Sequence, residues 1–556
     1  MSDAVEIATC DLETDPFKAG RKLHPFLAGW YDGKIIRKFW GDDCVARCWK
    51  SMRKYRGYIY LHNGGKFDLH FFLRVIPPRD IVPDGNPPIH GRIATLKIVD
   101  GPTLVDSYLI LPVPLAAHGK EEIDYVIFEE DQREKPANKK RIHAYFDTDL
   151  LSLHGFVSEF VTEYGYGLTL AGRAFAAGKK LLDIKKFPQT SRYYDDKFRQ
   201  YYFGGRVQFF KLGLVDFPCR YYDLNSAYPH AMLSRHAWGG KFSVQLREPG
   251  RNFEQAFFHV RGRADGCYPV RTQAGLDYPH QATEWHLTGW ELKTGLETGA
   301  FHPDKILAVH VPERTRDFAP YVHHFYRLKQ NATTPTERLF AKLMLNSFYG
   351  RFALNPREHK ETLWLPYGDT PPDYEEMDAD AVGDSGGWEI EKIWEDTDLV
   401  LWSRKKPPEK WRFFDVALAA SITGFVRASL WRALCTVKRP VYCDTDSIIC
   451  GDGAALPLGD ALGQWKLEAM SGPGQLWIAG KKLYAMRCRD GTWKTAAKGV
   501  RLPPADICRV ALGDAVEACS QAPTFSLYRQ DGYTRRTVRR AAFAPTWKPP
   551  HENNQS

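Results

Sequence analysis

The chain has 556 residues, too many for one hydrophobic core, so roughly two to four domains are expected. Apolar residues make up 44% and aromatic residues 13% of the sequence, which excludes an intrinsically disordered protein. No apolar run approaches about 18 residues and no signal-peptide pattern opens the chain, so a cytoplasmic protein without membrane contact is expected. The net charge of +9 is compatible with nucleic-acid binding without establishing it.

Acidic residues recur at three places in the first 150 residues. "VEIATCDLET" alternates as a strand does, which places Asp11 and Glu13 on one face. In "YIYLHNGGKFDLHFF" a strand-like run ends at two glycines, and Asp68 follows in the predicted loop. "HAYFDTDLLSLHGFVSEF" has helical spacing, with Tyr145 and Asp149 four residues apart on one face. Each carboxylate alone is more often a solvated surface group, but together they match a two-metal nuclease whose tyrosine orients water.

The segment "TPTERLFAKLMLNSFYG" begins as a helix does, with a capping box formed by Thr334 and Glu337 and a proline between them. One stripe of this predicted helix contains Leu339, Leu343 and Ser347. A second stripe contains Arg338, Lys342, Asn346 and Tyr349. Such a polar stripe is usually the solvated face of an amphipathic helix.

"VYCDTDSII" is predicted to be a hairpin with Asp444 and Asp446 in its turn. Two carboxylates this close repel each other unless a cation lies between them. Taken alone, the pattern also fits a surface turn with solvated aspartates.

Two charged segments lie outside these patterns. Between Asp369 and Asp398 there are twelve acidic residues and a single lysine, which predicts a solvated excursion from the core. Near the C-terminus four arginines at helical spacing predict a basic face suited to duplex phosphates: Arg535, Arg536, Arg539 and Arg540.

Taken in order, the motifs resemble those of family B DNA polymerases. "DLET", "HNGGKFD" and "YFDTD" resemble the three exonuclease motifs of proofreading enzymes, and "YYFGGR" resembles the linker motif that follows them. "YYDLNSAYPHAM", "KLMLNSFYGRFA" and "YCDTDSI" resemble polymerase motifs A, B and C, and "KKLYAM" contains a Lys-x-Tyr motif. The residues of motifs A to C are most similar to those of the protein-primed branch, which serves phages and plasmids with linear genomes capped by a terminal protein.

The resemblance implies a multidomain α/β fold, with a ribonuclease-H-like 3′–5′ exonuclease domain followed by a right-hand polymerase domain with two insertions. The implied divisions are 1–190 exonuclease, 191–240 palm, 241–325 first insertion, 326–356 fingers, 357–412 second insertion, 413–500 palm, and 501–556 thumb and tail.

The resemblance also implies the residues of the polymerase site. Asp223 and Asp446 would hold two Mg²⁺ ions, with Asp444 in support, and hard carboxylate oxygens suit that ion. Tyr228 would exclude a ribose 2′-hydroxyl, although a packed core aromatic is the ordinary interpretation of such a residue. The implied nucleotide-binding residues are Tyr228, Arg338, Lys342, Asn346, Tyr349 and Lys482.

In the exonuclease site, Asp11, Glu13, Asp68 and Asp149 would hold two further Mg²⁺ ions, with Tyr145 beside them and Mn²⁺ as the expected substitute. The implied DNA-binding residues are Tyr60, His62, Asn63, Phe67, Phe71, Ser107, Tyr202, Gly204, Gly205, Arg206 and Tyr484. Tyr108 departs from the family pattern, which has leucine after the serine.

The implied partners are template and primer DNA, dNTPs and a terminal protein that acts as primer. The first insertion would contact the terminal protein, and the second would enclose DNA and support strand displacement. A monomer acting in the host-cell cytoplasm is expected. A repair-type or primer-independent polymerase of the same family and a non-catalytic DNA-binding relative are the alternatives; the second is disfavoured because all seven carboxylates are present.

Overall fold

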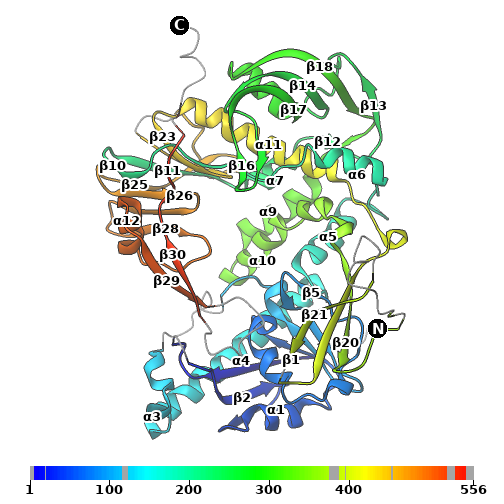
Figure 1. Ribbon diagram of the computed structural model, residues 1–556, viewed down its shortest axis with the longest axis vertical. Helices are drawn as coiled ribbons and strands as arrows, with labels where there is room; N and C mark the ends of the chain where they lie inside the picture. Colours follow the sequence, from blue (N-terminus) through cyan, green and yellow to red (C-terminus); the bar gives the residue numbers. More distant parts are fainter. Residues whose placement is uncertain are drawn as a thin grey trace.

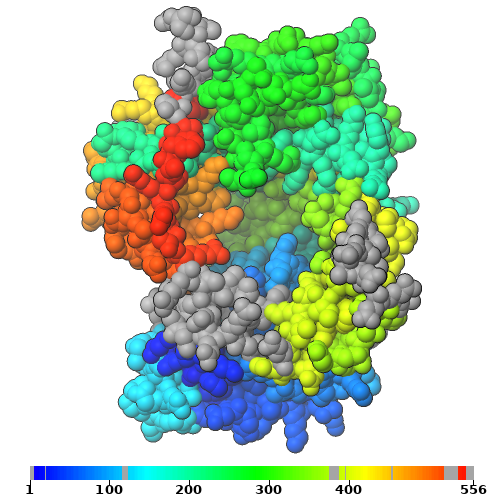
Figure 2. Space-filling view, in the orientation of Figure 1, coloured from blue at the N-terminus to red at the C-terminus, as the bar shows by residue number. Residues whose placement is uncertain are grey.

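The computed structural model describes residues 6–18, 21–114, 123–372, 374, 387–394, 396–451, 455–521, 533–545 and 547. In Figure 1 the N-terminal lobe lies at one end of the long axis, and the rest of the chain forms the remainder of the molecule. Figure 2 shows this face hollowed at its centre, between the orange C-terminal strands and the green and yellow segments. Within the described ranges, no helix is both long and apolar enough to cross a membrane.

The N-terminal lobe is built on a six-stranded sheet in the order β3-β2-β1-β4-β8-β7. Its strands are β1 (Ile7–Thr14), β2 (Pro25–Tyr31), β3 (Ile36–Trp40), β4 (Tyr58–Leu61), β7 (Thr95–Lys97) and β8 (Thr103–Asp106). Strand β1 pairs antiparallel with β2 and parallel with β4, as expected for a ribonuclease-H-like sheet. Small elements complete the lobe: α2 (Asp68–Phe72), α3 (Glu130–Arg133), β5 (Pro88–Ile89) and β6 (Arg92–Ile93).

Two helices cover the faces of this sheet. Because successive side chains of β1 point to opposite faces, Ala8, Cys10 and Leu12 pack in the same core as α1 (Cys44–Met52). The other face carries Asp11 and Glu13 and is covered by α4 (Pro136–Tyr164). The alternation of β1 therefore directs its acidic residues toward α4.

A five-stranded antiparallel sheet forms the predicted palm, in the order β25-β11-β24-β23-β9. Its strands are β9 (Val207–Phe209), β11 (Cys219–Leu224), β23 (Pro440–Asp444), β24 (Ser447–Cys450) and β25 (Trp465–Ser471). Helix α11 (Val416–Thr436), which is buried along most of its length, and α7 (Ala227–Ala231) contact each other in this region. The predicted hairpin of "VYCDTDSII" is β23 and β24.

A second sheet, in the order β10-β26-β27-β28, continues into the C-terminal elements. These elements are β10 (Gly213–Val215), β26 (Leu476–Gly480), β27 (Leu483–Arg487), β28 (Trp493–Ala497), α12 (Pro504–Leu512), β29 (Val516–Gln521) and β30 (Tyr533–Val538). The predicted helical spacing of the C-terminal arginines is wrong, because Arg535 and Arg536 lie on strand β30 and Arg539 and Arg540 follow it. Pairing with β29 determines this conformation, and local spacing alone could not reveal it.

The segment 241–325 contains a four-stranded sheet in the order β13-β18-β14-β17. Its strands are β13 (Phe242–Gln245), β14 (Phe257–Asp265), β17 (His280–Thr288) and β18 (Phe301–Pro312), and α8 (Gly289–Glu297) packs against α11. Two short pairs accompany it: β12 (His236–Ala237) with β19 (Thr315–Arg316), and β15 (Val270–Thr272) with β16 (Gly275–Asp277). Helices α5 (Leu170–Leu181) and α6 (Arg192–Arg199) lead from the N-terminal lobe into this region.

Helices α9 (Ala319–Asn331) and α10 (Pro335–Asn346) form an antiparallel pair. The predicted capping box at Thr334 and Glu337 is present. The buried residues of α10 are Phe340, Ala341, Met344 and Leu345, one position away from the stripe predicted to be apolar. Arg338, Lys342 and Asn346 are exposed, as predicted for the polar stripe.

The segment 357–412 forms a three-stranded sheet that is docked on the N-terminal lobe. Its strands are β20 (Lys360–Pro366), β21 (Glu389–Trp394) and β22 (Leu399–Lys405), in the order β20-β22-β21. Trp364 and Trp394 stack on each other at 4.9 Å and share one buried core with Leu69 and Phe72 of α2. Arg74 also forms an ion pair with Asp396. Seven of the twelve acidic residues of the predicted excursion lie outside the described residues, and part of the remainder forms β21.

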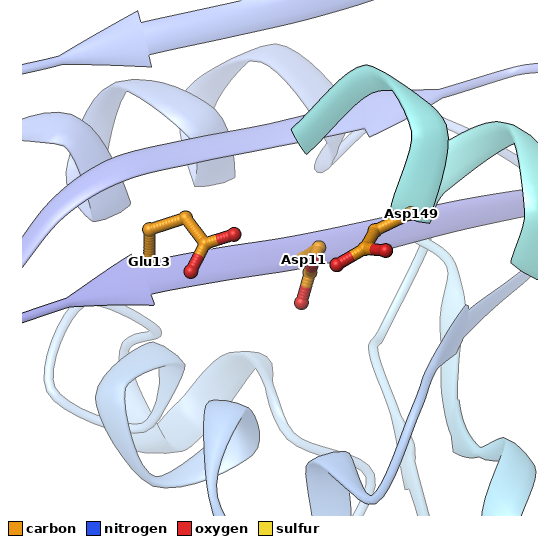
Figure 3. A group of neighbouring side chains, drawn as sticks. All are labelled: Asp11, Glu13 and Asp149. Atoms are coloured by element: carbon orange, nitrogen blue, oxygen red, sulfur yellow. The ribbon is translucent and has the colours of Figure 1, made fainter. Parts of the chain in front are cut away.

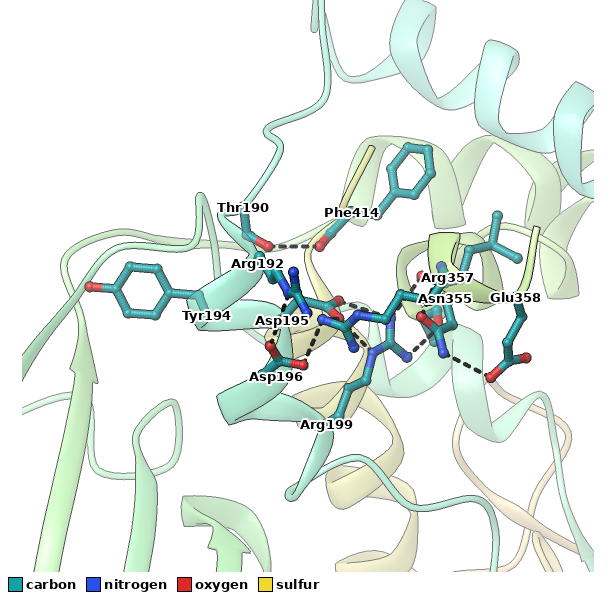
Figure 4. Close-up of polar contacts among 12 residues, drawn as sticks. Thr190, Arg192, Tyr194, Asp195, Asp196, Arg199, Asn355, Arg357, Glu358 and Phe414 are labelled. Atoms are coloured by element: carbon teal, nitrogen blue, oxygen red, sulfur yellow. Dashed lines mark hydrogen bonds and ion pairs between the residues drawn. The ribbon is translucent and has the colours of Figure 1, made fainter. Parts of the chain in front are cut away.

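An ion-pair network fastens the start of this segment to α6 (Figure 4). Arg357 pairs with Asp196 at 2.6 Å, and Arg199 pairs with the buried Asp195 at 2.6 Å. The Thr190 hydroxyl donates to the carbonyl of Phe414 at the other end of the segment. Both ends of the segment that contains β20, β21 and β22 therefore contact residues 190–196, at the start of α6.

Candidate active sites

The turn between β23 and β24 places two aspartates beside a third one. Thr445, at the centre of the turn, has φ of 58°, a strained conformation for a β-branched residue of the kind that concentrates at functional sites. In the neighbouring strand Asp223 lies opposite Ser447, and the Leu224 N–H donates to the Asp446 carbonyl at 2.7 Å. The antiparallel register therefore brings Asp223 and Asp446 together.

The electrostatics of these three aspartates differ. Burial, followed by repulsion from Asp223 and Asp444, raises the pKa of Asp446 to about 7. The pKa of Asp223 is raised by burial and by Glu468. Asp444 is instead held by Lys482, whose ammonium lies 2.8 and 2.6 Å from its two oxygens. A divalent cation would relieve the repulsion between Asp223 and Asp446, and their oxygen donors suit it.

Sequence reasoning missed Glu468, which is on β25 two residues beyond the partner of Asp223 in the strand register. Its approach to Asp223 depends on the pairing of β25 with β11, which has a register shift at this point, and β25 carries no recognised motif. Glu468 pairs with Lys466 at 3.2 Å.

A second carboxylate cluster lies in the N-terminal lobe. Oxygens of Asp11, Glu13 and Asp149 all lie within 4.8 Å of one another (Figure 3). Asp11 and Glu13 are on β1, and Asp149 is on α4. Asp68 begins α2 rather than lying in a loop, and it is only 3% exposed. Burial and then the charge of Asp11 raise the pKa of Asp68 well above its usual value, so of these three residues it is Asp11 whose charge acts on Asp68. This donor set also fits divalent cations.

Tyr145 lies one helical turn before Asp149, and its hydroxyl is 3.1 Å from that of Tyr125. Burial, the Tyr125 contact and the nearby charges of Asp149 and Glu13 all raise the pKa of Tyr145. Its hydroxyl therefore keeps its proton at neutral pH and remains a hydrogen-bond donor.

The rings of Tyr228 and Tyr349 stack 4.4 Å apart at 16°, although they come from α7 and from the turn after α10. Lys342 and Arg338 lie on the exposed stripe of α10. A further cation was missed by sequence reasoning: Lys329 of α9 has its pKa lowered by burial and then by Arg338 and Lys342. Its proximity depends on the pairing of two helices, which its own sequence context does not indicate.

The residues predicted to bind DNA fall into two groups according to the solvent exposure of their side chains. His62, Asn63, Phe67 and Tyr202 are partly exposed, and Gly204 is exposed. Tyr60, Phe71, Ser107 and Tyr484 are buried and contact protein. Arg206 is 2% exposed, with its guanidinium 4.0 Å from the ring of Tyr278 and 4.7 Å from that of Trp431. These five side chains are covered by protein in this structure, and their binding of DNA stays a prediction.

Gly205 has a structural role at the aspartate turn. A Cβ at this position would lie 2.5 Å from the Thr445 hydroxyl oxygen, and the adjacent Arg206 carbonyl accepts from the Thr445 N–H at 2.6 Å. The glycine thus allows this loop to lie directly against the turn.

Comparison with known proteins agrees with this geometry. The family model described as DNA polymerase type B, organellar and viral, matches residues 103–380. The DNA-directed DNA polymerase of Enterobacteria phage PRD1 is 36% identical over 574 residues, covering 96% of this chain and 98% of that one. A probable DNA polymerase of Agaricus bitorquis is 26% identical over 58% of this chain.

Among solved structures, Phi29 DNA polymerase complexed with primer-template DNA and incoming nucleotide substrates has a TM-score of 0.68. The match covers 97% of this chain and 100% of that one at 17% identity. The binary complex of the same polymerase with primer-template DNA has a TM-score of 0.67 at 19% identity, covering 89% and 90%.

Proposed function

This chain belongs to the type B DNA polymerases, organellar and viral, and we propose that it copies a linear genome from a protein primer, with proofreading and strand displacement. It is a DNA-directed DNA polymerase, so the family, fold class and enzyme class predicted from the sequence are confirmed. The observation that carries the site assignment is the register of β11 and β24, which pairs Asp223 with Ser447 and so sets Asp223 beside the turn that bears Asp446. The domain divisions predicted from the motifs are part of the proposal.

In the polymerase site, Asp223 and Asp446 would hold the divalent cations that this family uses, and we propose Mg²⁺ because both ligands are carboxylates. When bound, two such ions activate the primer hydroxyl and stabilise the leaving pyrophosphate. Lys482 fixes Asp444 and so orients the turn that bears Asp446. Tyr228 and Tyr349 provide a stacked surface for the incoming sugar and base.

The triphosphate is bound by cations on the fingers. Arg338 and Lys342 project from the exposed stripe of α10, and Lys329 approaches from α9. Three positive charges on two rigid helices suit the polyanion, because they need little rearrangement as it binds. Asn346, one turn beyond Lys342, stays a predicted contact to the nascent base pair.

In the exonuclease site, Asp11, Glu13, Asp68 and Asp149 would hold a second pair of cations, which generate hydroxide and polarise the scissile phosphate. The protonated Tyr145 hydroxyl is placed to orient the attacking water beside Asp149. His62, Asn63 and Phe67 remain exposed enough to receive the 3′ end of a single strand.

Separate sites can be tested with one substitution in each lobe. We expect Asp446→Ala to abolish nucleotide addition with Mg²⁺ while degradation of single-stranded DNA continues. Asp11→Ala should do the reverse and raise misincorporation. Both variants are compared by primer extension and by release of the 3′ nucleotide, with thermal unfolding as the check of folding. If a correctly folded single variant lost both activities, the assignment of two independent active sites would be wrong.

Protein priming is supported by the sequence match along almost all of the PRD1 polymerase. The four-stranded sheet in 241–325 is the part that we propose contacts the terminal protein. We propose that the chain acts as a monomer in the host cytoplasm with a terminal protein as partner. The test is transfer of labelled dNMP to the cognate terminal protein without a DNA primer, with Asp446→Ala as control. If DNA primers are extended and the terminal protein stays unlabelled, priming from DNA, the repair-type alternative, is correct.

A further inference from the structure

A buried arginine outside all recognised motifs contacts the loop that leads to Asp68. Arg92, on β6, is 6% exposed, and its Nη1 donates to Asp106 Oδ2 at 2.6 Å. The same nitrogen donates to Asn63 Oδ1 at 3.2 Å. Its guanidinium carbon lies 4.6 Å from the centre of the Tyr108 ring. One side chain therefore contacts both a predicted DNA-binding residue and the residue that departs from the family pattern.

Asp106 holds this arrangement in place from the end of β8. It is fully buried, accepts from the Tyr108 N–H at 3.0 Å, and accepts from the backbone of Gly65. A Cβ on Gly65 would lie 2.8 Å from the Asp106 carboxylate and 2.1 Å from the Ile93 carbonyl. The loop that carries Asn63 and leads to Asp68 is thus pressed against the Arg92–Asp106 pair.

The chemistry of the contact fixes the orientation of the Asn63 amide. A guanidinium has donors only, so the amide must present its oxygen to Arg92. Its NH₂ group is then directed away from Arg92, and Asn63 is partly exposed. An amide held in this way offers two donors to a phosphate oxygen without first having to turn.

We propose that Arg92 is a positioning residue of the exonuclease site, which fixes the Asn63 amide for binding the 3′ end of single-stranded DNA. The inference rests on the proposed exonuclease activity. Arg92 acts on binding through Asn63, and the metal-holding carboxylates keep their own contacts. Its substitution should therefore change KM rather than kcat.

The test is Arg92→Lys, which keeps the positive charge beside Asp106 but loses the planar fork. We expect KM for single-stranded DNA to rise about tenfold, as for one lost charged hydrogen bond, with kcat within about twofold of the parent. The Mg²⁺ concentration at half-maximal rate and primer extension should not change. The control is Arg37→Lys, which alters a partly exposed arginine–aspartate pair of the same lobe and should change none of these values.

A double-mutant cycle separates positioning from general loss of structure. If Arg92 acts through Asn63, Arg92→Lys combined with Asn63→Ala should have the KM of Asn63→Ala alone. The inference is overturned if the two substitutions raise KM independently, so that the KM of the double variant reflects the product of the two increases. An unchanged KM in Arg92→Lys, or a lower kcat with a higher metal requirement, would overturn it as well. A parent enzyme that degrades no single-stranded DNA would instead refute the proposed exonuclease.

Discussion

The contact between Gly205 and the aspartate turn predicts a large effect from the addition of one methyl group. In Gly205→Ala the new Cβ would lie 2.5 Å from Oγ1, 2.8 Å from Cγ2 and 3.0 Å from Cβ of Thr445, where ordinary contacts are 3.4–4 Å. Rotation of the Thr445 side chain cannot relieve the conflict, because its Cβ is itself too close. The turn that carries Asp444 and Asp446 must therefore move.

The magnitude follows from the cost of overpacking, about 1–3 kcal/mol for one extra methyl group in a well-packed site. If that energy opposes the aligned state of the turn, kcat for nucleotide addition should fall by about 5- to 150-fold. The assay is single-nucleotide incorporation on a primer–template, in an Asp11→Ala background so that degradation does not interfere.

Two further variants make this prediction specific. Thr445→Gly removes all three clashing atoms and accepts the positive φ of the turn, so adding Gly205→Ala to it should cost little. Gly204→Ala, whose Cβ would meet nothing within 4 Å, should stay near the parent value. The reasoning is refuted if Gly205→Ala is within twofold of the parent, or if its effect persists in full beside Thr445→Gly.

Three other predictions follow from single contacts. Tyr228→Val should raise ribonucleotide use relative to deoxynucleotide, because the ring stacked on Tyr349 fills the space beside the sugar; an unchanged ratio of kcat/KM values would assign Tyr228 to packing alone. Lys329→Ala should raise KM for dNTP about tenfold with little change in primer–template affinity, whereas the opposite pattern would exclude a triphosphate contact. Trp364→Ala should cost about 3–5 kcal/mol of stability and lower exonuclease activity before polymerisation, since its ring is buried against the N-terminal lobe; equal loss of both activities in thermal inactivation would contradict this.

The docking of the β20–β22 sheet also changes how strand displacement should be studied. The family resemblance of the sequence implies that 357–412 encloses DNA. Deletion of the whole segment would be a direct test of that role only if the segment made no other contacts. In the structure, its removal would uncover the core around Leu69 and Phe72 beside Asp68. Substitutions of exposed side chains are therefore the better probe, because they leave this core covered.

Much of each active site is determined by local sequence. The strand period places Asp11 and Glu13 on one face, the helical period places Tyr145 and Asp149 on another, and a tight turn between strand-forming residues presents Asp444 and Asp446. The capping box of α10 is equally local. These features are predictable because they depend on neighbours within a few residues.

Tertiary structure alone decided which groups meet across the chain. Asp223 approaches Asp446 through strand pairing, and Lys482 holds Asp444 and Arg92 reaches Asn63 through side-chain contacts between segments that are distant in sequence. The same cause buries Arg206 against Tyr278, although its motif suggests a DNA contact. A sequence pattern specifies the local direction of a side chain, whereas its partner and its exposure depend on how distant segments pack.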